Sequence, residues 1–221
     1  MAGRIRAAIF DMDGTLVNNM HFHQQAWFAF LEEHGLRVTE EEYHDKNAGI
    51  LPEIIARFFP EVTDIETVYE LGRKKEQKYQ EIYRPHIQAL PGLESFLSSL
   101  RRSGVRTGLA TAADRGNIDF TLDALGIREY FDVIVGAEEV TKGKPDPEVF
   151  LVTAEKLGLE PADCAAFEDS NPGIRSALAA GMRVVGLATT HTNDELSIFP
   201  LHAIINDYNV SDPVGFLNQQ T

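Results

Sequence analysis

The sequence predicts an α/β protein whose core is a doubly wound parallel sheet, with an α-helical domain inserted into it. Three observations lead to this prediction. Short apolar runs of strand length recur along the chain, helical patterns separate most of them, and one long segment contains helical patterns alone. Strands that alternate with helices are typical of a parallel sheet covered on both faces. The 221 residues, 43% of them hydrophobic, suffice for one sizeable core and a smaller appended unit.

Six mostly apolar runs are predicted to be strands. The first, Ile5 to Phe10, ends abruptly in acidic residues, as a buried parallel strand would. The others are Val105–Thr111, Phe131–Ala137, Cys164–Glu168, Arg183–Thr189 and Ala203–Asn206.

Helices with recognisable start and stop signals lie between these strands. The first of these predicted helices begins at Pro91-Gly92, and the last begins at Ser211. Between them, helices are predicted at Asn117–Leu125, Pro147–Leu157 and Pro172–Ala180. Proline at the first helical position and glycine just beyond the end are the expected boundary residues. From Thr190 onward the chain is expected to complete the core and to carry no chemistry.

The segment 18–87 breaks the alternation. Phe22, Ala26 and Phe30 form one helical stripe, and Glu53–Phe59 and Asp64–Tyr83 also have helical patterns. So much helix after one strand exceeds a simple crossover. We therefore expect a helical cap domain at residues 18–87, inserted into a core built from residues 1–17 and 88–221. Trp27 is expected in the interior of this cap.

Charge and composition restrict the function. The formal net charge of −14 repels nucleic-acid phosphates and anionic lipid, so we expect neither nucleic acid nor membrane as a partner. Cys164 is the only cysteine, which excludes an intrachain disulfide. No signal peptide and no spanning apolar stretch is recognised. These features predict a soluble, cytoplasmic protein.

The strongest chemical signal is Phe10-Asp11-Met12-Asp13-Gly14-Thr15-Leu16, at the end of the first predicted strand. Ligands of open α/β sheets bind beyond the carboxyl ends of strands. Asp11 could attack a phosphorus atom there as a nucleophile, while Asp13 donates and accepts the leaving-group proton. Taken alone, the motif fits an ordinary acidic turn after a strand better than a catalytic site.

Three further signals follow later strands. The Thr111 hydroxyl and the following amides, those of Ala112 and Ala113, could hold phosphate oxygens. Lys144, in the Lys142–Pro147 loop, could neutralise phosphate charge. Glu168 and Asp169 offer the hard oxygen ligands that Mg²⁺ prefers. Each has an ordinary structural alternative, but their joint occurrence at four strand ends predicts a phosphoryl-transfer site.

These four motifs resemble the signature motifs of the haloacid dehalogenase superfamily, whose core is Rossmann-like. The inserted helical cap is similar to that of the β-phosphoglucomutase-like phosphatase branch. The resemblance implies Asp11 as nucleophile and Asp13 as general acid/base. It implies that Mg²⁺ is held by the Asp11 carboxylate, the Asp13 carbonyl and Asp169, with Glu168 as a ligand or neighbour. It also implies that Thr111 and Lys144 hold the transferred phosphoryl group.

The cap bears on the choice between phosphatase and mutase. His23 and Lys75 resemble cap residues of β-phosphoglucomutases, and each has an alternative as a solvated helix residue. Two departures from the mutase pattern favour hydrolysis. The Gly49–Pro52 loop lacks the arginine that mutases carry there, and Asp114 stands where they have a lysine, although Arg115 or Lys46 could compensate.

We therefore predict a phosphatase that hydrolyses a small phosphomonoester, such as a sugar phosphate, through an aspartyl-phosphate. The alternatives are a β-phosphoglucomutase-type mutase and a protein that binds a phosphorylated ligand without turnover. Retention of both aspartates, Lys144 and Asp169 argues against the last. The expected partner is a small phosphorylated metabolite, and the expected state is a monomer or weak homo-oligomer.

Overall fold

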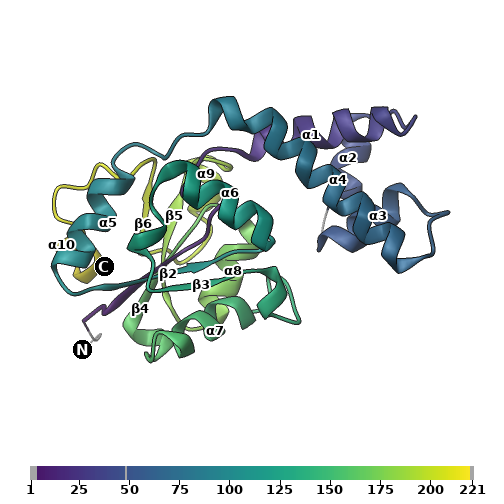
Figure 1. The fold of residues 1–221 in the computed structure, drawn as a ribbon. Coiled ribbons are helices and arrows are strands. Elements are labelled where there is room, and N and C mark those ends of the chain that lie inside the picture. The colour runs from purple at the N-terminus through teal and green to yellow at the C-terminus, as the bar shows by residue number, and fades with distance from the viewer. Residues whose placement is uncertain (1–3, 48, 220–221) are drawn as a thin grey trace. The chain divides into compact units, whose positions relative to one another are not determined.

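The computed structural model describes residues 4–47 and 49–219, which form two compact units (Figure 1). The core unit combines the chain up to Asn18 with the chain from Ile87 onward, and the helical unit is Asn19–His86. Each unit is described by itself below.

The core unit contains a six-stranded sheet in which every neighbouring pair is parallel. Its strands are β1 (Ala7–Phe10), β2 (Arg106–Ala110), β3 (Val133–Val135), β4 (Cys164–Glu168), β5 (Arg183–Leu187) and β6 (Ala203–Ile205). They lie in the order β3-β2-β1-β4-β5-β6, so the chain reverses its direction of winding between β1 and β4. Ligands bind at such a switch point, beyond the carboxyl ends of the strands. The predicted fold class is confirmed.

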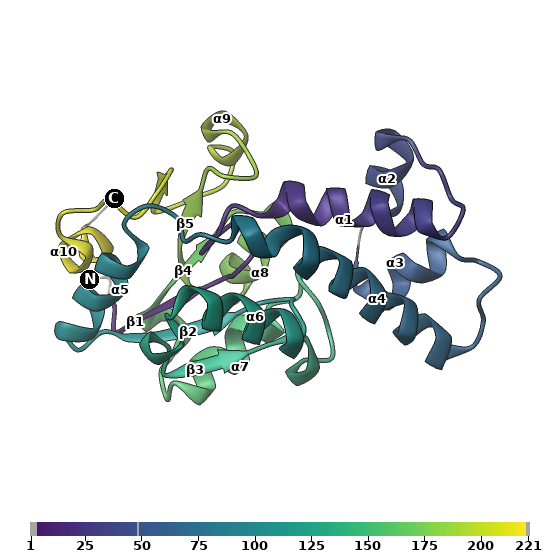
Figure 2. The same ribbon diagram turned by 45° about the horizontal axis from the view of Figure 1, so that its top comes forward.

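Two hydrophobic clusters explain why the strands are apolar without alternation. In β1, Ala8 and Phe10 belong to a cluster shared with helices α5 (Leu93–Arg102) and α6 (Arg115–Leu125). Ala7 and Ile9 belong to a second cluster shared with α7 (Glu148–Lys156) and α8 (Asn171–Ala179). Successive side chains of a strand point to opposite faces, so both faces of β1 are buried. Figure 2 shows α5 and α10 (Pro213–Asn218) side by side over one part of the sheet.

The bounds of the core helices follow from their capping residues. They are α5 (Leu93–Arg102), α6 (Arg115–Leu125), α7 (Glu148–Lys156), α8 (Asn171–Ala179), α9 (Asn193–Leu196) and α10 (Pro213–Asn218). Helix α6 begins two residues before the predicted Asn117 because the Asp114 side chain accepts a hydrogen bond from the Asn117 amide and caps the helix. Single 3₁₀ turns cover Arg84–His86, Arg128–Tyr130, Ala137–Glu139 and Pro161–Asp163.

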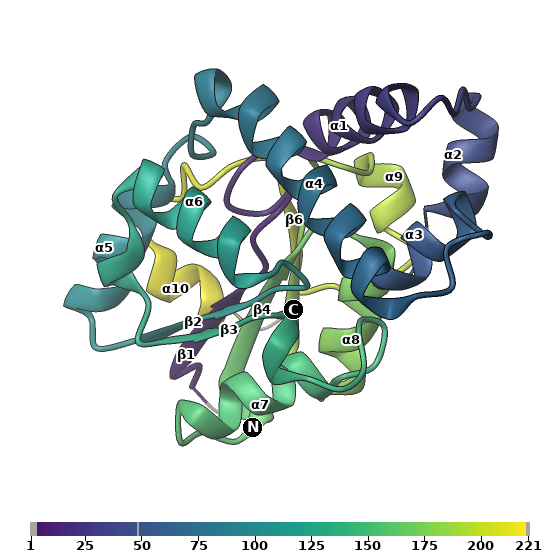
Figure 3. The same cartoon turned by 45° about the vertical axis from the view of Figure 1, so that its right-hand side comes forward.

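The helical unit consists of α1 (Met20–Glu33), α2 (Glu40–Lys46), α3 (Leu51–Phe58) and α4 (Ile65–Tyr83). Figure 3 shows α1 and α4 lying side by side. Trp27 is 2% exposed within the unit's apolar cluster, which confirms it as an interior residue. Among the described residues, no helix is both long and apolar enough to cross a membrane.

Helix α2 is absent from the sequence prediction. Its start is marked by a capping box, in which the Thr39 hydroxyl accepts from the Glu42 amide and the Glu42 carboxylate accepts from the Thr39 amide. The Thr-x-x-Glu spacing that makes this box is visible in the sequence. The helix is short and strongly charged, with Tyr43 as its only buried residue, so it has almost no apolar periodicity to reveal it.

Candidate active site

The acidic residues of the first and fourth motifs meet at the switch point of the sheet. Phe10 pairs with Phe167 across β1 and β4, and the Asp11 amide donates to the Phe167 carbonyl at 3.0 Å. The two phenylalanine rings stack with centroids 4.6 Å apart beneath the site. This register brings Asp11 and the acids at the end of β4 to the same edge of the sheet.

Three carboxylates form a compact buried group. One oxygen from each of Asp11, Glu168 and Asp169 lies within 4.8 Å of the other two, and the side chains are almost fully buried. Asp13, which follows Asp11 by two residues in the sequence, is half-buried. Hard oxygen donors in this arrangement suit a divalent cation such as Mg²⁺ or Mn²⁺. These residues could therefore hold a metal ion.

Lys144 joins the first and fourth motifs. Its ammonium lies 2.6 Å from an oxygen of Asp11 and 2.6 Å from an oxygen of Glu168. Burial alone lowers the pKa of Lys144, but the charges of Asp11 and Glu168 outweigh burial and raise the pKa above its usual range. The side chain is therefore a fixed cation next to the predicted nucleophile.

Negative charge nevertheless remains in excess. Burial raises the pKa of Asp11 well above its usual value, and the charges of Glu168, Asp169 and Asp13 raise it further against the opposing effect of Lys144. Burial and the charge of Glu168 also raise the pKa of Asp169, to about 7. Four carboxylates around one ammonium thus form a site whose charge balance favours the addition of a cation.

Two glycines make room for these carboxylates. A Cβ added to Gly14 would lie 2.0 Å from Oδ2 of Asp169, and a Cβ added to Gly173 would lie 1.7 Å from Oε1 of Glu168. Gly14 also has a φ of +78°, which other residues rarely adopt. The turn after β1 and the first turn of α8 can therefore approach the acids only as glycine.

Hydroxyl groups orient both acids of the fourth motif. The Ser170 amide and hydroxyl donate to one oxygen of Glu168, at 2.9 and 3.0 Å. The Thr15 hydroxyl donates to Oδ1 of Asp169 at 3.0 Å, and the Thr190 hydroxyl donates to Oδ2. Thr190, from the part of the chain that was expected to carry no chemistry, therefore contacts a candidate metal ligand.

The second motif lies at the end of β2, next to β1. Thr111 is buried, its amide donates to Val135, and its hydroxyl accepts from the Ala113 amide at 3.1 Å. Ala112 is exposed between them. The Arg115 guanidinium pairs with Asp119 on the surface of α6, at 3.1 Å. The structure therefore brings Thr111 to the edge of the sheet where Asp11 lies, whereas the side chain of Arg115 is engaged along its own helix.

The two cap residues singled out from the sequence contact each other within the helical unit. Lys75 is 3% exposed, and its ammonium lies 3.1 Å from Nδ1 of His23 and 2.9 Å from the Glu76 carboxylate. The His23 ring stacks on Tyr79, with centroids 3.7 Å apart. The alternative in which Lys75 is solvated is wrong. A signal existed, since Leu71, Lys75 and Tyr79 are spaced by four residues and share one buried face of α4.

An arginine that the sequence reading overlooked lies beside the loop after α2. Arg57 follows Gly49 by eight residues, yet its guanidinium is 3.8 Å from the position that a Cβ on Gly49 would occupy. Its Nε donates to the Lys46 carbonyl at 2.8 Å. The absence of arginine from Gly49–Pro52 therefore does not mean the absence of a guanidinium near that loop.

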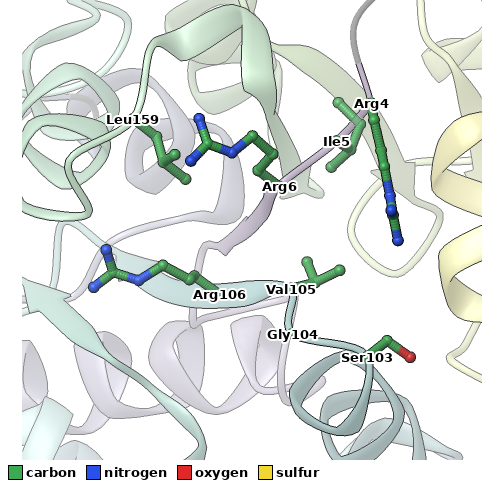
Figure 4. Close-up of a pocket in the computed structure, with 8 residues that line it drawn as sticks. All are labelled: Arg4, Ile5, Arg6, Ser103, Gly104, Val105, Arg106 and Leu159. Atoms are coloured by element: carbon green, nitrogen blue, oxygen red, sulfur yellow. The ribbon is translucent and has the colours of Figure 1, made fainter.

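A hollow of about 390 Å³ lies at the opposite, amino-terminal edge of the sheet (Figure 4). Three of its lining residues are arginines, Arg4, Arg6 and Arg106. Arg6 is paired with Asp163, and Arg106 lies 4.0 Å from Asp132. The Arg4 side chain points away from those of Arg6 and Arg106 (Figure 4). Two of these three charges are therefore already paired, and the third is directed away from them.

Comparison with known proteins agrees with the fold and the site. The profile of the haloacid dehalogenase-like hydrolases matches residues 8–187, which include all four motifs. The chain belongs to this family.

Individual relatives include both phosphatases and mutases. The chain is 32% identical to fructose-1-phosphate phosphatase YqaB of Escherichia coli K12, over 84% of this chain and 97% of that one. It is also 32% identical to β-phosphoglucomutase of Bacillus subtilis 168, over 83% of each. The crystal structure of CbbY from Rhodobacter sphaeroides in complex with phosphate superposes with a TM-score of 0.80 at 26% identity, covering 92% of this chain and 95% of that one.

Proposed function

We propose that the protein is a Mg²⁺-dependent phosphatase that hydrolyses a small phosphomonoester through an aspartyl-phosphate on Asp11. One observation carries the proposal: Lys144 lies 2.6 Å from both Asp11 and Glu168, beside Asp169, at the switch point of the sheet. An acyl phosphate needs a carboxylate nucleophile next to fixed positive charge, and this cluster supplies both.

The reaction would proceed in two displacements. A carboxylate oxygen of Asp11 forms a bond to phosphorus while the ester P–O bond breaks, and Asp13 gives its proton to the departing oxygen. Asp13 then takes a proton from a water molecule, whose oxygen attacks the phosphorus of the aspartyl-phosphate. Inorganic phosphate leaves and the Asp11 carboxylate is regenerated.

Different residues of the site would hold the metal ion and the phosphoryl group. The Asp11 carboxylate, the Asp13 carbonyl and Asp169 would hold Mg²⁺, with Glu168 next to them; the ion would supply neutralisation of phosphate charge. Lys144 would contribute a second positive charge that requires no movement, because its two carboxylate partners already fix it. At the end of β2, the Thr111 hydroxyl and the Ala112 amide would hold phosphoryl oxygens.

The relatives and the helical unit support a proposal for the substrate class. YqaB is named for a sugar phosphate, and β-phosphoglucomutase for its conversion of one. We propose a sugar phosphate or a similar small metabolite, with residues 18–87 acting as a cap that excludes water and contacts the substrate. His23 and Arg115 are the proposed contacts outside the motifs, and Lys75 is proposed to act through His23, whose imidazole it contacts. We further propose a cytoplasmic monomer or weak homo-oligomer, with no nucleic-acid or membrane partner.

A phosphomutase is the second candidate, and one observation favours it. Arg57 lies beside Gly49, where a guanidinium could hold the second phosphate of a bisphosphate. Against it, Asp114 adds negative charge in the loop after Thr111 and is committed to capping α6. A weak hold on the second phosphate favours release of product and attack by water.

The test is phosphate release from a panel of phosphomonoesters, which includes fructose 1-phosphate and β-glucose 1-phosphate, with glucose 6-phosphate followed in parallel. We expect free phosphate without isomerised sugar, and loss of both in Asp11→Asn and in EDTA. Formation of glucose 6-phosphate, enhanced by a bisphosphate and reduced in Arg57→Leu, would establish the mutase instead. Full activity in Asp11→Asn would exclude the covalent mechanism.

A further inference from the structure

Two adjacent threonines after β5 reach across the end of the sheet. The Thr190 hydroxyl donates to Oδ2 of Asp169, which follows the neighbouring strand β4. The Thr189 hydroxyl donates to the carbonyl oxygen of Gly14, in the turn after β1, two strands away. The segment after β5 therefore contacts both sides of the switch point.

These contacts hold Asp169 from both sides. Its Oδ1 accepts from the Thr15 hydroxyl at 3.0 Å, and its Oδ2 accepts from Thr190. A carboxylate has about four lone-pair positions, so two hydroxyl donors can fix its plane and still leave positions for a cation. With one donor on each oxygen, rotation of the carboxylate breaks at least one hydrogen bond.

The position of Thr190 indicates that its hydroxyl matters more than its packing. Asp169 is 1% exposed, whereas Thr190 is exposed at the surface end of the contact. Replacement of the hydroxyl by a methyl group would therefore remove a hydrogen bond to a buried carboxylate without opening a cavity in the core. Partners that orient metal-binding side chains typically contribute 10- to 100-fold to metal affinity.

We propose that Thr190 is a positioning residue that holds the Asp169 carboxylate in the orientation that binds the divalent cation, and that Thr189 fixes the Gly14 turn against the same segment. The inference rests on the proposed function, because it takes Asp169 to be a metal ligand. It adds a fifth segment, the end of β5, to the four motifs of the site.

The test measures metal affinity apart from turnover. Metal-stripped full-length protein is titrated with Mn²⁺ while the signal of the free aquo ion is followed by electron paramagnetic resonance, and Mg²⁺ affinity is obtained by competition. We expect Thr190→Val to raise the Kd about tenfold. Thr190→Ser, which keeps the hydroxyl, should stay within about twofold of wild type. The Mg²⁺ concentration for half-maximal phosphate release should rise in parallel, with kcat at saturating Mg²⁺ nearly unchanged.

Thr67→Val is the matched control. Its hydroxyl donates to the Asp64 carboxylate at 2.7 Å in the helical unit, so the same chemical change is made at an exposed pair outside the proposed site. A Thr190→Val protein that melts lower but binds Mn²⁺ with wild-type affinity would overturn the inference and leave the phosphatase proposal intact. If the wild-type protein hydrolyses no phosphomonoester, but Thr190→Val still lowers the affinity for Mn²⁺ as expected, only the phosphatase proposal is overturned.

Discussion

Each of the two units buries a lysine, and the two lysines have different surroundings. Lys144 of the core unit contacts Asp11 and Glu168, within a group of four carboxylates. Lys75 of the helical unit contacts one carboxylate, Glu76, together with the His23 imidazole. Its ammonium also lies 5.2 Å from the centre of the Trp27 ring, an arrangement that stabilises a cation.

The difference lies in the charge balance. The Lys75–Glu76 pair carries no net charge, and the rings of Trp27 and Tyr79 lie next to its ammonium. A buried charge that is paired in this way needs no further ligand. In the core site, burial raises the pKa values of Asp11 and Asp169, and more carboxylates than its one ammonium can neutralise raise them further. An unbalanced buried group costs stability and is retained where a ligand restores the balance. The comparison therefore favours a ligand-binding role for Lys144 and a mainly structural role for Lys75.

Removal of the core lysine should have the largest effect. Lys144→Met leaves Asp11 and Glu168 without a cation, and we expect phosphate release to fall by about a thousandfold or more. Lys142→Met is the matched control: it removes a lysine two positions away whose side chain is 70% exposed and lies 3.5 Å from Asp146. Comparable kcat/KM values in the two variants would contradict the role of Lys144.

Removal of the cap lysine should act mainly on stability. Lys75→Met removes the ammonium that pairs with the largely buried Glu76 carboxylate, and we expect the free energy of unfolding in urea to fall by about 2 kcal/mol. Lys78→Met on the same helix breaks a partly exposed pair with Glu33 and should cost about 0.5 kcal/mol or less. A rise in KM with no loss of stability would instead assign Lys75 to direct substrate binding.

The sequence predicts the parts of the site that depend on strand ends. Because parallel strands share one carboxyl edge, the positions of Asp11, Thr111 and Glu168 along the chain suffice to expect them at one edge. Thr190 could not be predicted this way, since its contact depends on how β5 is placed against β4. Nothing local distinguishes its hydroxyl from that of any other surface threonine.

The helical unit was less predictable for a related reason. The charged run around Lys75 suggests solvent, and only the four-residue spacing from Leu71 to Tyr79 places the lysine on the buried face. Arg57 was overlooked because it approaches Gly49 through the fold of α3 and not through the adjacent sequence. In both cases the position of a charged side chain depends on helix packing, which residue type alone does not reveal.

The pH dependence of stability tests the charge imbalance directly. In metal-free protein the pKa of Asp169 rises from 3.8 to about 7, so the folded state keeps a proton that the unfolded state loses. Stability from this group is present below pH ~4 and is lost as pH rises through 7. In EDTA, we expect the Tm to fall by roughly 3–6 °C between pH 5 and pH 7.5. Saturating Mg²⁺ should cancel most of that fall.

Two variants measured under the same conditions test whether Asp169 causes this change of Tm with pH. Asp169→Asn cannot titrate, so its Tm should change less with pH than that of wild type, and Mg²⁺ should restore little. Asp207→Asn alters an exposed carboxylate that accepts from the Asn209 amide, and should keep the wild-type slope. If Tm changes equally with pH in all three proteins, the negative charge of the four carboxylates is balanced without a cation. The contrast between the two buried lysines would then have lost its physical basis.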